Sequence, residues 1–163
     1  MRRPVIVAVA VILAVGFTVW WNSSTQVVKR RTKSLVTTLT IPTTEQGAAR
    51  KIRAMSLDGF LDDSIQVVAK NIPDLEEPLD RDQINSAFSY FCDRAVSSDF
   101  TLKKFQSVDI HGEEASVKAL ISVRLNLPGG DHGVNGNHEV TLLWQHGKDA
   151  WKLKSVEWQK VGP

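Results

Sequence analysis

Residues 115–127 read ASVKALISVRLNL, and apolar side chains alternate with polar ones along nearly the whole stretch. One set is apolar: Val117, Ala119, Ile121, Val123 and Leu125. The other is polar: Ser116, Lys118, Ser122 and Arg124. Successive side chains of a strand point to opposite faces, so this period of two predicts a strand with one buried face. A sheet with one apolar face needs a second layer to cover it.

Three further stretches have strand patterns: residues 100–110, 138–146 and 150–161. In residues 100–110 the alternation slips between Leu102 and Phe105. In residues 150–161 the apolar face changes after Leu153, and a bulge near Ser155 would restore it. Turns and a glycine-rich loop at 128–137 separate the stretches, which predicts about four long antiparallel strands joined as hairpins.

The region before these strands has helical spacing in three segments, at about 43–58, 61–72 and 80–95. Thr43 with Gln46, and Asp80 with Gln83, fit capping boxes. The third segment has the clearest apolar face: Ile84, Ala87, Phe88, Phe91, Cys92 and Ala95. Helices followed by strands predict an α+β fold, with three helices packed on one face of a curved antiparallel sheet of about four strands.

Residues 5–21 read VIVAVAVILAVGFTVWW and contain no charge. As a helix this run is about 25 Å long, close to the thickness of a bilayer core. Arg2 and Arg3 precede it, and Trp20 and Trp21 end it with side chains that favour the membrane interface. We expect an uncleaved transmembrane anchor. The alternative is a cleaved signal peptide, but the run exceeds a typical signal core and no Ala-x-Ala site follows.

The expected organisation is an anchor at 1–21, a basic Ser/Thr-rich linker at 22–42 and a folded domain at 43–163. Within the linker, residues 34–41 are either a short strand or an extended spacer. Basic residues flank both ends of the anchor, so the positive-inside rule acts in both directions. We expect a single-pass protein with its domain on the extracytoplasmic side. The alternative is a cytosolic domain whose basic cluster contacts an anionic leaflet.

The net charge of +2 hides an asymmetry between the two parts of the chain. Residues 1–42 contain six basic residues and no acidic one, which leaves 14 basic against 18 acidic residues in 43–163. An acidic domain lacks the basic surface that nucleic-acid binding requires, so we expect no nucleic-acid partner. Cys92 is the only cysteine, which excludes an internal disulfide and is typical of a small buried side chain.

The order of elements, and the final turn and strand Asp149-Ala150-Trp151-Lys152-Leu153, resemble the nuclear-transport-factor-2-like, or SnoaL-like, cone superfamily over residues 43–161. The resemblance implies a cone that encloses a pocket. Some members are ketosteroid isomerases or dehydratases, and many are binding or assembly modules. VirB8-like secretion components resemble the layout of one span followed by a periplasmic domain, although they usually have a longer N-terminus. The resemblance also implies a homodimer or an envelope protein partner. The N-terminal helix separately predicts membrane lipid as a partner.

Four residues are candidates for lining such a pocket: Tyr90, His138, Trp144 and His146. Tyr90 lies at the edge of the third helix face, whereas the other three share one strand face. The structural alternative is that the histidines are strand-end residues and the tryptophan is core. His138 and His146 are about 26 Å apart along a strand, too far to share a metal ion. We assign no catalytic residue, metal or cofactor.

The sequence therefore favours a membrane-anchored, non-catalytic binding or assembly module of the cell envelope. The alternative is a small-molecule enzyme of the isomerase or dehydratase type, which needs an acid–base pair inside the cone. An ionisable side chain deep in the cone with an aligned partner would favour the enzyme.

Overall fold

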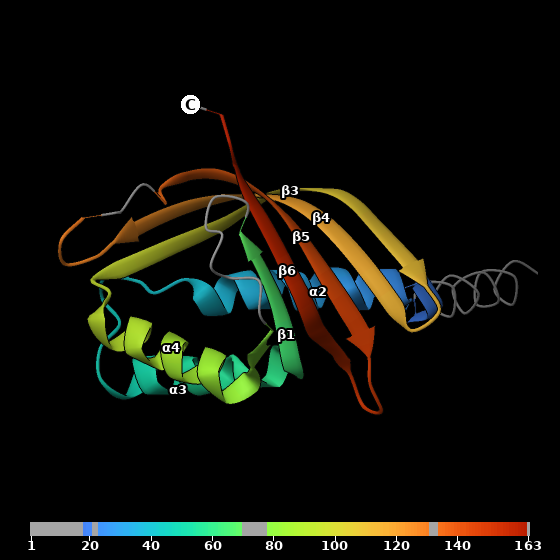
Figure 1. Cartoon of the computed structure of the whole chain (residues 1–163), viewed down its shortest axis with the longest axis horizontal. Helices are drawn as coiled ribbons and strands as arrows, with labels where there is room; N and C mark the ends of the chain where they lie inside the picture. The colour runs from blue at the N-terminus through green and yellow to red at the C-terminus, as the bar shows by residue number, and fades with distance from the viewer. Residues whose placement is uncertain (1–17, 21–22, 70–77, 131–133, 163) are drawn as a thin grey trace, which may run out of the picture.

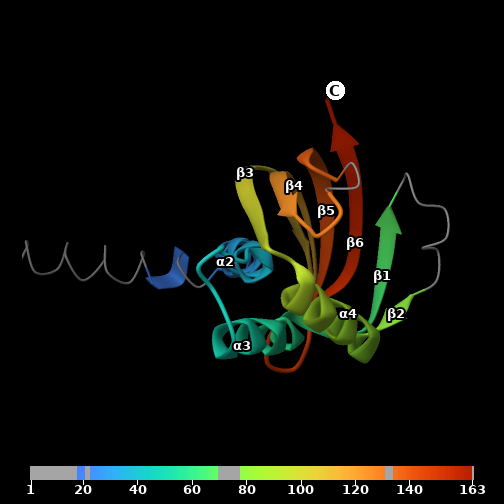
Figure 2. The ribbon, with the colours of Figure 1, turned by 90° about the vertical axis from the view of Figure 1, so that its left-hand side faces the viewer.

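The computed structural model describes residues 18–20, 23–69, 78–130 and 134–162. The helices are α2 (Ser24–Leu39), α3 (Ala48–Ser56), the 3₁₀ turn η1 (Asp58–Phe60) and α4 (Arg81–Arg94). The strands are β1 (Leu61–Ala69), β2 (Leu79–Asp80), β3 (Ser97–His111), β4 (Glu114–Asn126), β5 (Gly136–His146) and β6 (Trp151–Val161). They form one curved sheet in the order β2-β1-β6-β5-β4-β3, and the helices lie within its curve (Figures 1 and 2).

The four C-terminal strands form the antiparallel hairpins that the alternation predicts. The sheet as a whole is mixed and has six strands, because β1 pairs parallel to β6 and β2 adds to the edge of β1. The helix predicted at 61–72 is therefore wrong for residues 61–69. Leu61 and Ile65 have helical spacing, but both are buried from a strand, since pairing with β6 outweighs local periodicity in a short apolar run.

Both predicted irregularities of the strand pattern are bulges in the structure. In β3 the pairing shifts between Leu102 and Lys104 and again between Phe105 and Ser107. The first shift returns Phe105 to the face of Leu102, opposite Ala119, and the second returns Val108 to that face, opposite Val117. In β6 the pairing with β5 shifts between Leu153 and Ser155, as expected. Each extra residue restores the apolar face and increases the local twist of its strand.

Helix α2 is the main departure from the expected organisation. The linker predicted at 22–42, and the short strand or spacer at 34–41, are wrong for residues 24–39, which form this helix. Its buried residues recur at helical spacing: Val28, Thr32, Leu35 and Val36. They pack against the sheet as part of the same core as β4 and β5, so the folded unit includes residues assigned to the linker.

Helix α3 has basic residues on its inner side. Arg50 donates to the backbone carbonyls of Cys92 (2.8 Å), Ala95 (2.6 Å) and Val96 (3.0 Å), at the C-terminal end of α4. Ile52 and Met55, in contrast, are 65% and 76% exposed. Helix C-termini leave carbonyls without partners inside the helix, and Arg50 satisfies those of α4.

The two predicted capping boxes differ in outcome. Asp80 caps α4, with its side chain accepting from the Gln83 backbone amide and the Gln83 side chain accepting from the Asp80 amide. Thr43 does not cap α3, which begins at Ala48 after Gly47. Gly47 has a φ of 55°, a backbone conformation that favours glycine.

The predicted anchor at 5–21 lies outside the described residues except for 18–20. Among the residues that the structure describes, no helix is both long and apolar enough to cross a bilayer. Trp20, one of the expected interface residues, is described and half exposed, whereas Arg2, Arg3 and Trp21 lie outside the described ranges.

Candidate functional site

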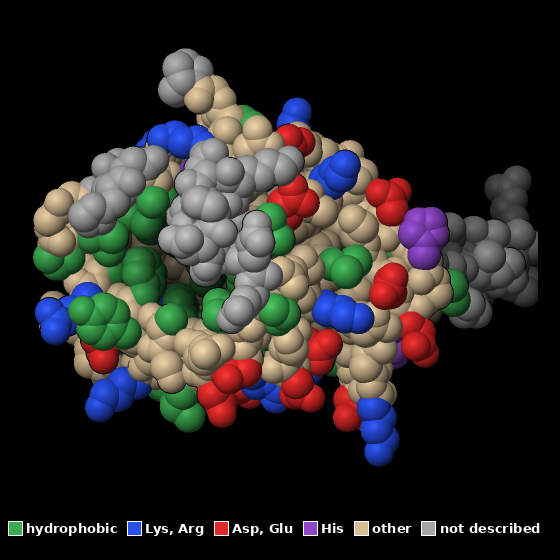
Figure 3. Space-filling view, viewed as in Figure 1, with side chains coloured by type: hydrophobic (Ala, Val, Ile, Leu, Met, Phe, Trp, Pro, Cys, Tyr) green, Lys and Arg blue, Asp and Glu red, His purple; other side chains and the backbone are tan. Residues whose placement is uncertain are grey.

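The inner side of the curved sheet has an apolar hollow, which Figure 3 shows between α4 and the strands above it. Half-buried apolar side chains of α4, the strands and their loops pack against the core, among them Ile84, Phe91, Phe100, Leu125, Leu127, Val134 and Trp158. The strand register puts Phe100, Leu125 and Trp158 on the inner face of the sheet. Apolar clefts with a few polar groups are the usual form of a small-molecule site. The hollow is therefore the candidate site. We call the end of the curved sheet at which it lies the open end.

His138 is the polar side chain that the strands bring to the open end. It lies on the inner face of β5, opposite Ile121 of β4 and Lys160 of β6, and is only 5% exposed. Its Nε2 is 2.7 Å from the carbonyl oxygen of Val134. Its ring stacks on the Trp158 ring, with centroids 5.8 Å apart. A buried imidazole is thus fixed in orientation by one hydrogen bond and one aromatic contact.

Trp144 lies on the same face of β5 but at the closed end of the cone. It is fully buried, and the Arg31 guanidinium of α2 lies 5.9 Å from its ring centroid. Arg31 also donates to the Gly59 carbonyl (2.7 Å) and lies over the Phe60 ring. Burial lowers the pKa of Arg31 below its ordinary value because it disfavours the charged form. Trp144 is therefore sealed beneath α2 and does not reach a ligand.

The other two pocket candidates lie away from the hollow. Tyr90 is 63% exposed on α4, and its ring contacts the guanidinium of Arg94 (5.3 Å). His146 is exposed at the end of β5, with its ring edge-on to Trp151. Of the four residues that the sequence suggests, His138 is thus the one that is buried on the inner face of β5 beside the half-buried Trp158.

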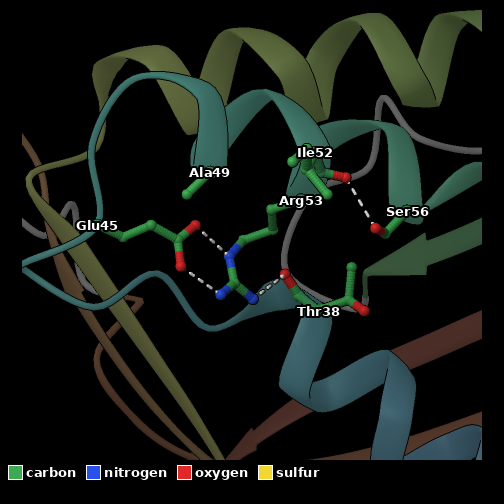
Figure 4. A pocket seen from close by; sticks show the side chains of 6 residues that line it. All are labelled: Thr38, Glu45, Ala49, Ile52, Arg53 and Ser56. Carbon is green, nitrogen blue, oxygen red and sulfur yellow. Dashed lines mark hydrogen bonds and ion pairs between the residues drawn. The ribbon is translucent and has the colours of Figure 1, made fainter.

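A second depression, of about 310 Å³, lies between α2 and α3 (Figure 4). Its charged groups already have partners inside the protein. Arg53 forms two hydrogen bonds with the Glu45 carboxylate and donates to the carbonyls of Thr37 (2.9 Å) and Thr38 (3.3 Å). The pKa of Glu45 is lowered, first because Arg53 donates to it. We interpret this depression as a structural joint between two helices.

The remaining titratable candidates do not assemble into a site. Asp131 and His132 lie outside the described residues. Asp109 and His111 are exposed on β3. Within the described ranges, no three His, Cys, Asp or Glu side chains come close enough to hold a metal ion. Cys92 is buried as predicted, and burial is the main reason that its thiol pKa is raised.

Neither a protein-family model nor a curated relative matches the sequence. Solved structures do match. An NTF2-like protein from Cytophaga hutchinsonii superposes with a TM-score of 0.65 at 12% identity, over 85% of this chain and 99% of that one. The fold is NTF2-like. A protein with a cystatin-like fold from Caulobacter vibrioides has a TM-score of 0.64 at 14% identity, over 87% and 92% of the two chains.

Two of these NTF2-like neighbours have provisional enzyme names. One, from Streptomyces avermitilis, is named a dehydratase (TM-score 0.63, 13% identity, 87% of this chain and 99% of that one). The other, from Parabacteroides distasonis, is named a ketosteroid isomerase (TM-score 0.56, 12% identity, 87% and 91%). At such low identity the likeness establishes the fold of this chain and leaves its chemistry to its own side chains.

Two residues at the hollow were not candidates from the sequence. Val134 contributes a backbone carbonyl, which no side-chain pattern reveals. Trp158 lies on the inner face only because the bulge between Leu153 and Ser155 shifts the second half of β6. The bulge was predicted, so the position of Trp158 on the face of His138 was accessible from the alternation pattern.

Proposed function

We propose that the domain is a non-catalytic binding module that takes a small apolar molecule into the hollow at its open end. The observation that carries the proposal is the set of half-buried apolar side chains around that hollow. A folded domain normally buries such side chains. Where a recess leaves them partly exposed, an apolar ligand that covers them removes apolar surface from water, which favours binding.

The surroundings of His138 support binding over catalysis. An acid–base mechanism needs a titratable group aligned with a second one. His138 contacts the Val134 carbonyl and the Trp158 ring, neither of which is a titratable group that could act as its partner. Among the described residues, the buried polar side chains are Thr32, Ser98 and His138.

The proposal is tested by titrating toluene into the full chain in lipid nanodiscs, with ¹³C-labelled methyl groups observed by NMR. Saturable shifts of the Val134 and Leu125 methyls are expected. Phe91→Asp places a charge at the hollow and should abolish these shifts, because burying an unpaired charge is costly. Tyr90→Asp, an exposed neighbour on the same helix, should leave them intact. Methyl groups at the hollow that never respond would overturn the proposal.

Membrane attachment is a separate part of the proposed function. We infer from residues 1–21 that one N-terminal span holds the domain at a membrane, on the extracytoplasmic side. Fractionation with intact-mass measurement tests it, since a mature chain that begins near residue 22–26 would show cleavage. A C-terminal reporter that is active only outside the cytosol tests the orientation.

The rival function is a small-molecule isomerase or dehydratase. The observation in its favour is a buried imidazole at the mouth of a fold whose neighbours include proteins provisionally named for those activities. Turnover of a ketosteroid by the wild-type chain, lost in His138→Phe, would favour this rival over the binding module.

A further inference from the structure

The chain enters the folded domain almost directly after the apolar N-terminal run. The backbone amide of Ser23 donates to the Trp20 carbonyl (3.1 Å), and α2 begins at the next residue, Ser24. Val28, in the second turn of α2, is already completely buried in the core. The predicted linker therefore does not separate the run from the domain. A run that spans a membrane would hold the first half of α2 at the membrane surface.

Two lysines of α2 lie within reach of that surface. At 1.5 Å per residue along a straight helix, Lys29 is about 12 Å and Lys33 about 18 Å beyond Trp21. Ser23 has an extended backbone (φ −60°, ψ 144°), so α2 starts in a new direction, and such a bend shortens both distances to the surface. Helical side chains also point back toward the N-terminus, which here is the side of the membrane.

The exposed side of this part of α2 carries positive charge. The helix contains no acidic residue. Lys33 is exposed, and Lys29 is half-buried with its ammonium group 5.7 Å from the Phe105 ring centroid of β3. Neither lysine forms an ion pair with a carboxylate in the part of the chain that the structure describes. Residues 102–108, around that phenylalanine, contain two lysines and no acidic residue, so the neighbouring strand adds to the positive charge.

The spacing of the two lysines favours an anion between them. Residues i and i+4 are neighbours on one face of a helix, and like charges at this spacing repel each other. Arg31, which lies between them in the sequence, faces the other way, since it donates to the Gly59 carbonyl and covers Trp144. The basic stretch is thus divided into one residue that holds the core and two that point outward beside β3.

From this geometry we propose that Lys29 and Lys33 bind the phosphate groups of anionic lipids, so that the domain docks on the membrane through this face of α2. The inference rests on the proposed membrane attachment and adds the class of lipid that the domain contacts. Anionic lipids attract basic residues beside a span over about a Debye length. Residues 43–163 contain 18 acidic against 14 basic residues, so the same lipids repel the rest of the domain and turn α2 toward the membrane.

The test uses the full chain in nanodiscs with a small fraction of lipid that has a spin-labelled headgroup, and NMR measures relaxation of the backbone amide protons. One set of discs contains zwitterionic phosphatidylcholine, and a second set adds anionic phosphatidylglycerol. Relaxation enhancement at residues 29–33 should be several-fold stronger in the anionic discs, because each lysine near an anionic surface shifts docking about fivefold. Salt at about 1 M, where the Debye length is about 3 Å, should remove the difference.

Single substitutions identify the residues responsible. Lys29→Gln and Lys33→Gln should each reduce the enhancement in anionic discs and leave the value in neutral discs unchanged. Lys51→Gln removes the same charge from an exposed position on α3 and should retain the wild-type difference. The salt dependence of the wild-type chain does not require any variant to fold.

The possible results separate this inference from the attachment on which it rests. If the amides of residues 24–28 show no enhancement in either kind of disc, the domain is not held at the membrane, and both proposals are overturned. If residues 24–28 are enhanced and residues 29–33 respond equally in the two kinds of disc, the attachment remains and the lipid contact is wrong. A difference between discs that persists in both lysine variants would also overturn the lipid contact.

Discussion

The two ends of the inner face of β5 have the same sequence pattern and opposite roles. At the open end, His138 is buried, bonds the Val134 carbonyl and stacks on the half-buried Trp158. At the closed end, about 20 Å along the strand by its rise per residue, Trp144 is completely buried. The difference comes from the neighbouring element, since Arg31 of α2 covers Trp144, whereas His138 stacks on Trp158 of β6. Alternation identifies which face of the strand is buried, but the covering layer decides which part of that face is sealed by a helix.

The largest effect is expected from the closed end. Trp144→Ala should lower the free energy of unfolding by about 3–5 kcal/mol, because it removes a fully buried aromatic side chain and leaves a cavity. Trp158→Ala is the matched change at the open end and should cost roughly half as much, since Trp158 is half-buried. Denaturation of both variants followed by circular dichroism measures the difference, and equal losses would contradict the contrast between the two ends.

A smaller loss of stability should follow from replacing Arg31, the residue that covers Trp144. Arg31→Met removes the hydrogen bond to Gly59 and the contacts with the Phe60 and Trp144 rings, and should cost about 1–2 kcal/mol. Lys33→Met, on the exposed side of the same helix, should change stability by less than about 0.5 kcal/mol. A more stable Arg31→Met would show instead that desolvation of the guanidinium outweighs its contacts.

The smallest effect concerns the joint that holds the far end of α2, where Arg53 donates to Thr37 and Thr38. Glu45→Gln weakens the Arg53–Glu45 pair and should cost about 0.5–1 kcal/mol at neutral pH. The folded-state pKa of Glu45 is lowered, so the pair stabilises the fold above the ordinary value of 4.5 and loses its effect as pH falls through the lowered pKa.

Denaturation of the wild type and Glu45→Gln across this pH range measures the effect, and the two curves should converge in acid. Glu114→Gln, at the exposed first residue of β4, is the control and should show no such pH-dependent difference. A Glu45→Gln deficit that stays constant into acid would mean that packing, and not the charge of Glu45, holds the joint.

The sheet was largely predictable because the alternation that indicates a strand lies within the sequence of each strand. The alternation along β4 and β5 survives in the structure, and even the phase slips of β3 and β6 mark real bulges. The class of fold followed from the order of helices and strands. The parallel strand β1 was not predictable in this way, because Leu61, Ile65 and Val68 have the spacing of a helix face and only the pairing with β6 makes the segment a strand.

The site was predictable only in part, and α2 explains why. Val28, Thr32, Leu35 and Val36 have the spacing of a helical face, which is the signal that would have identified this helix. The neighbouring basic residues suggested a linker beside a membrane, whereas Arg31 faces the core. With α2 missing, Trp144 and His138 were equivalent pocket candidates. With α2 in place, Trp144 is core beneath Arg31, whereas His138 is buried against the half-buried Trp158 of β6.

Helix α3 has arginine side chains on its inner side and large apolar side chains on its outer side, which affects how its sequence can vary. Arg50 and Arg53 join α3 to the ends of α4 and α2, while Ile52 and Met55 project outward. Mutational tolerance along this helix should therefore run against hydropathy: the charged positions are constrained, and the apolar ones are free to become polar. A solubility-directed redesign could replace Ile52 and Met55 with glutamate or lysine and leave the scaffold that supports the hollow unchanged.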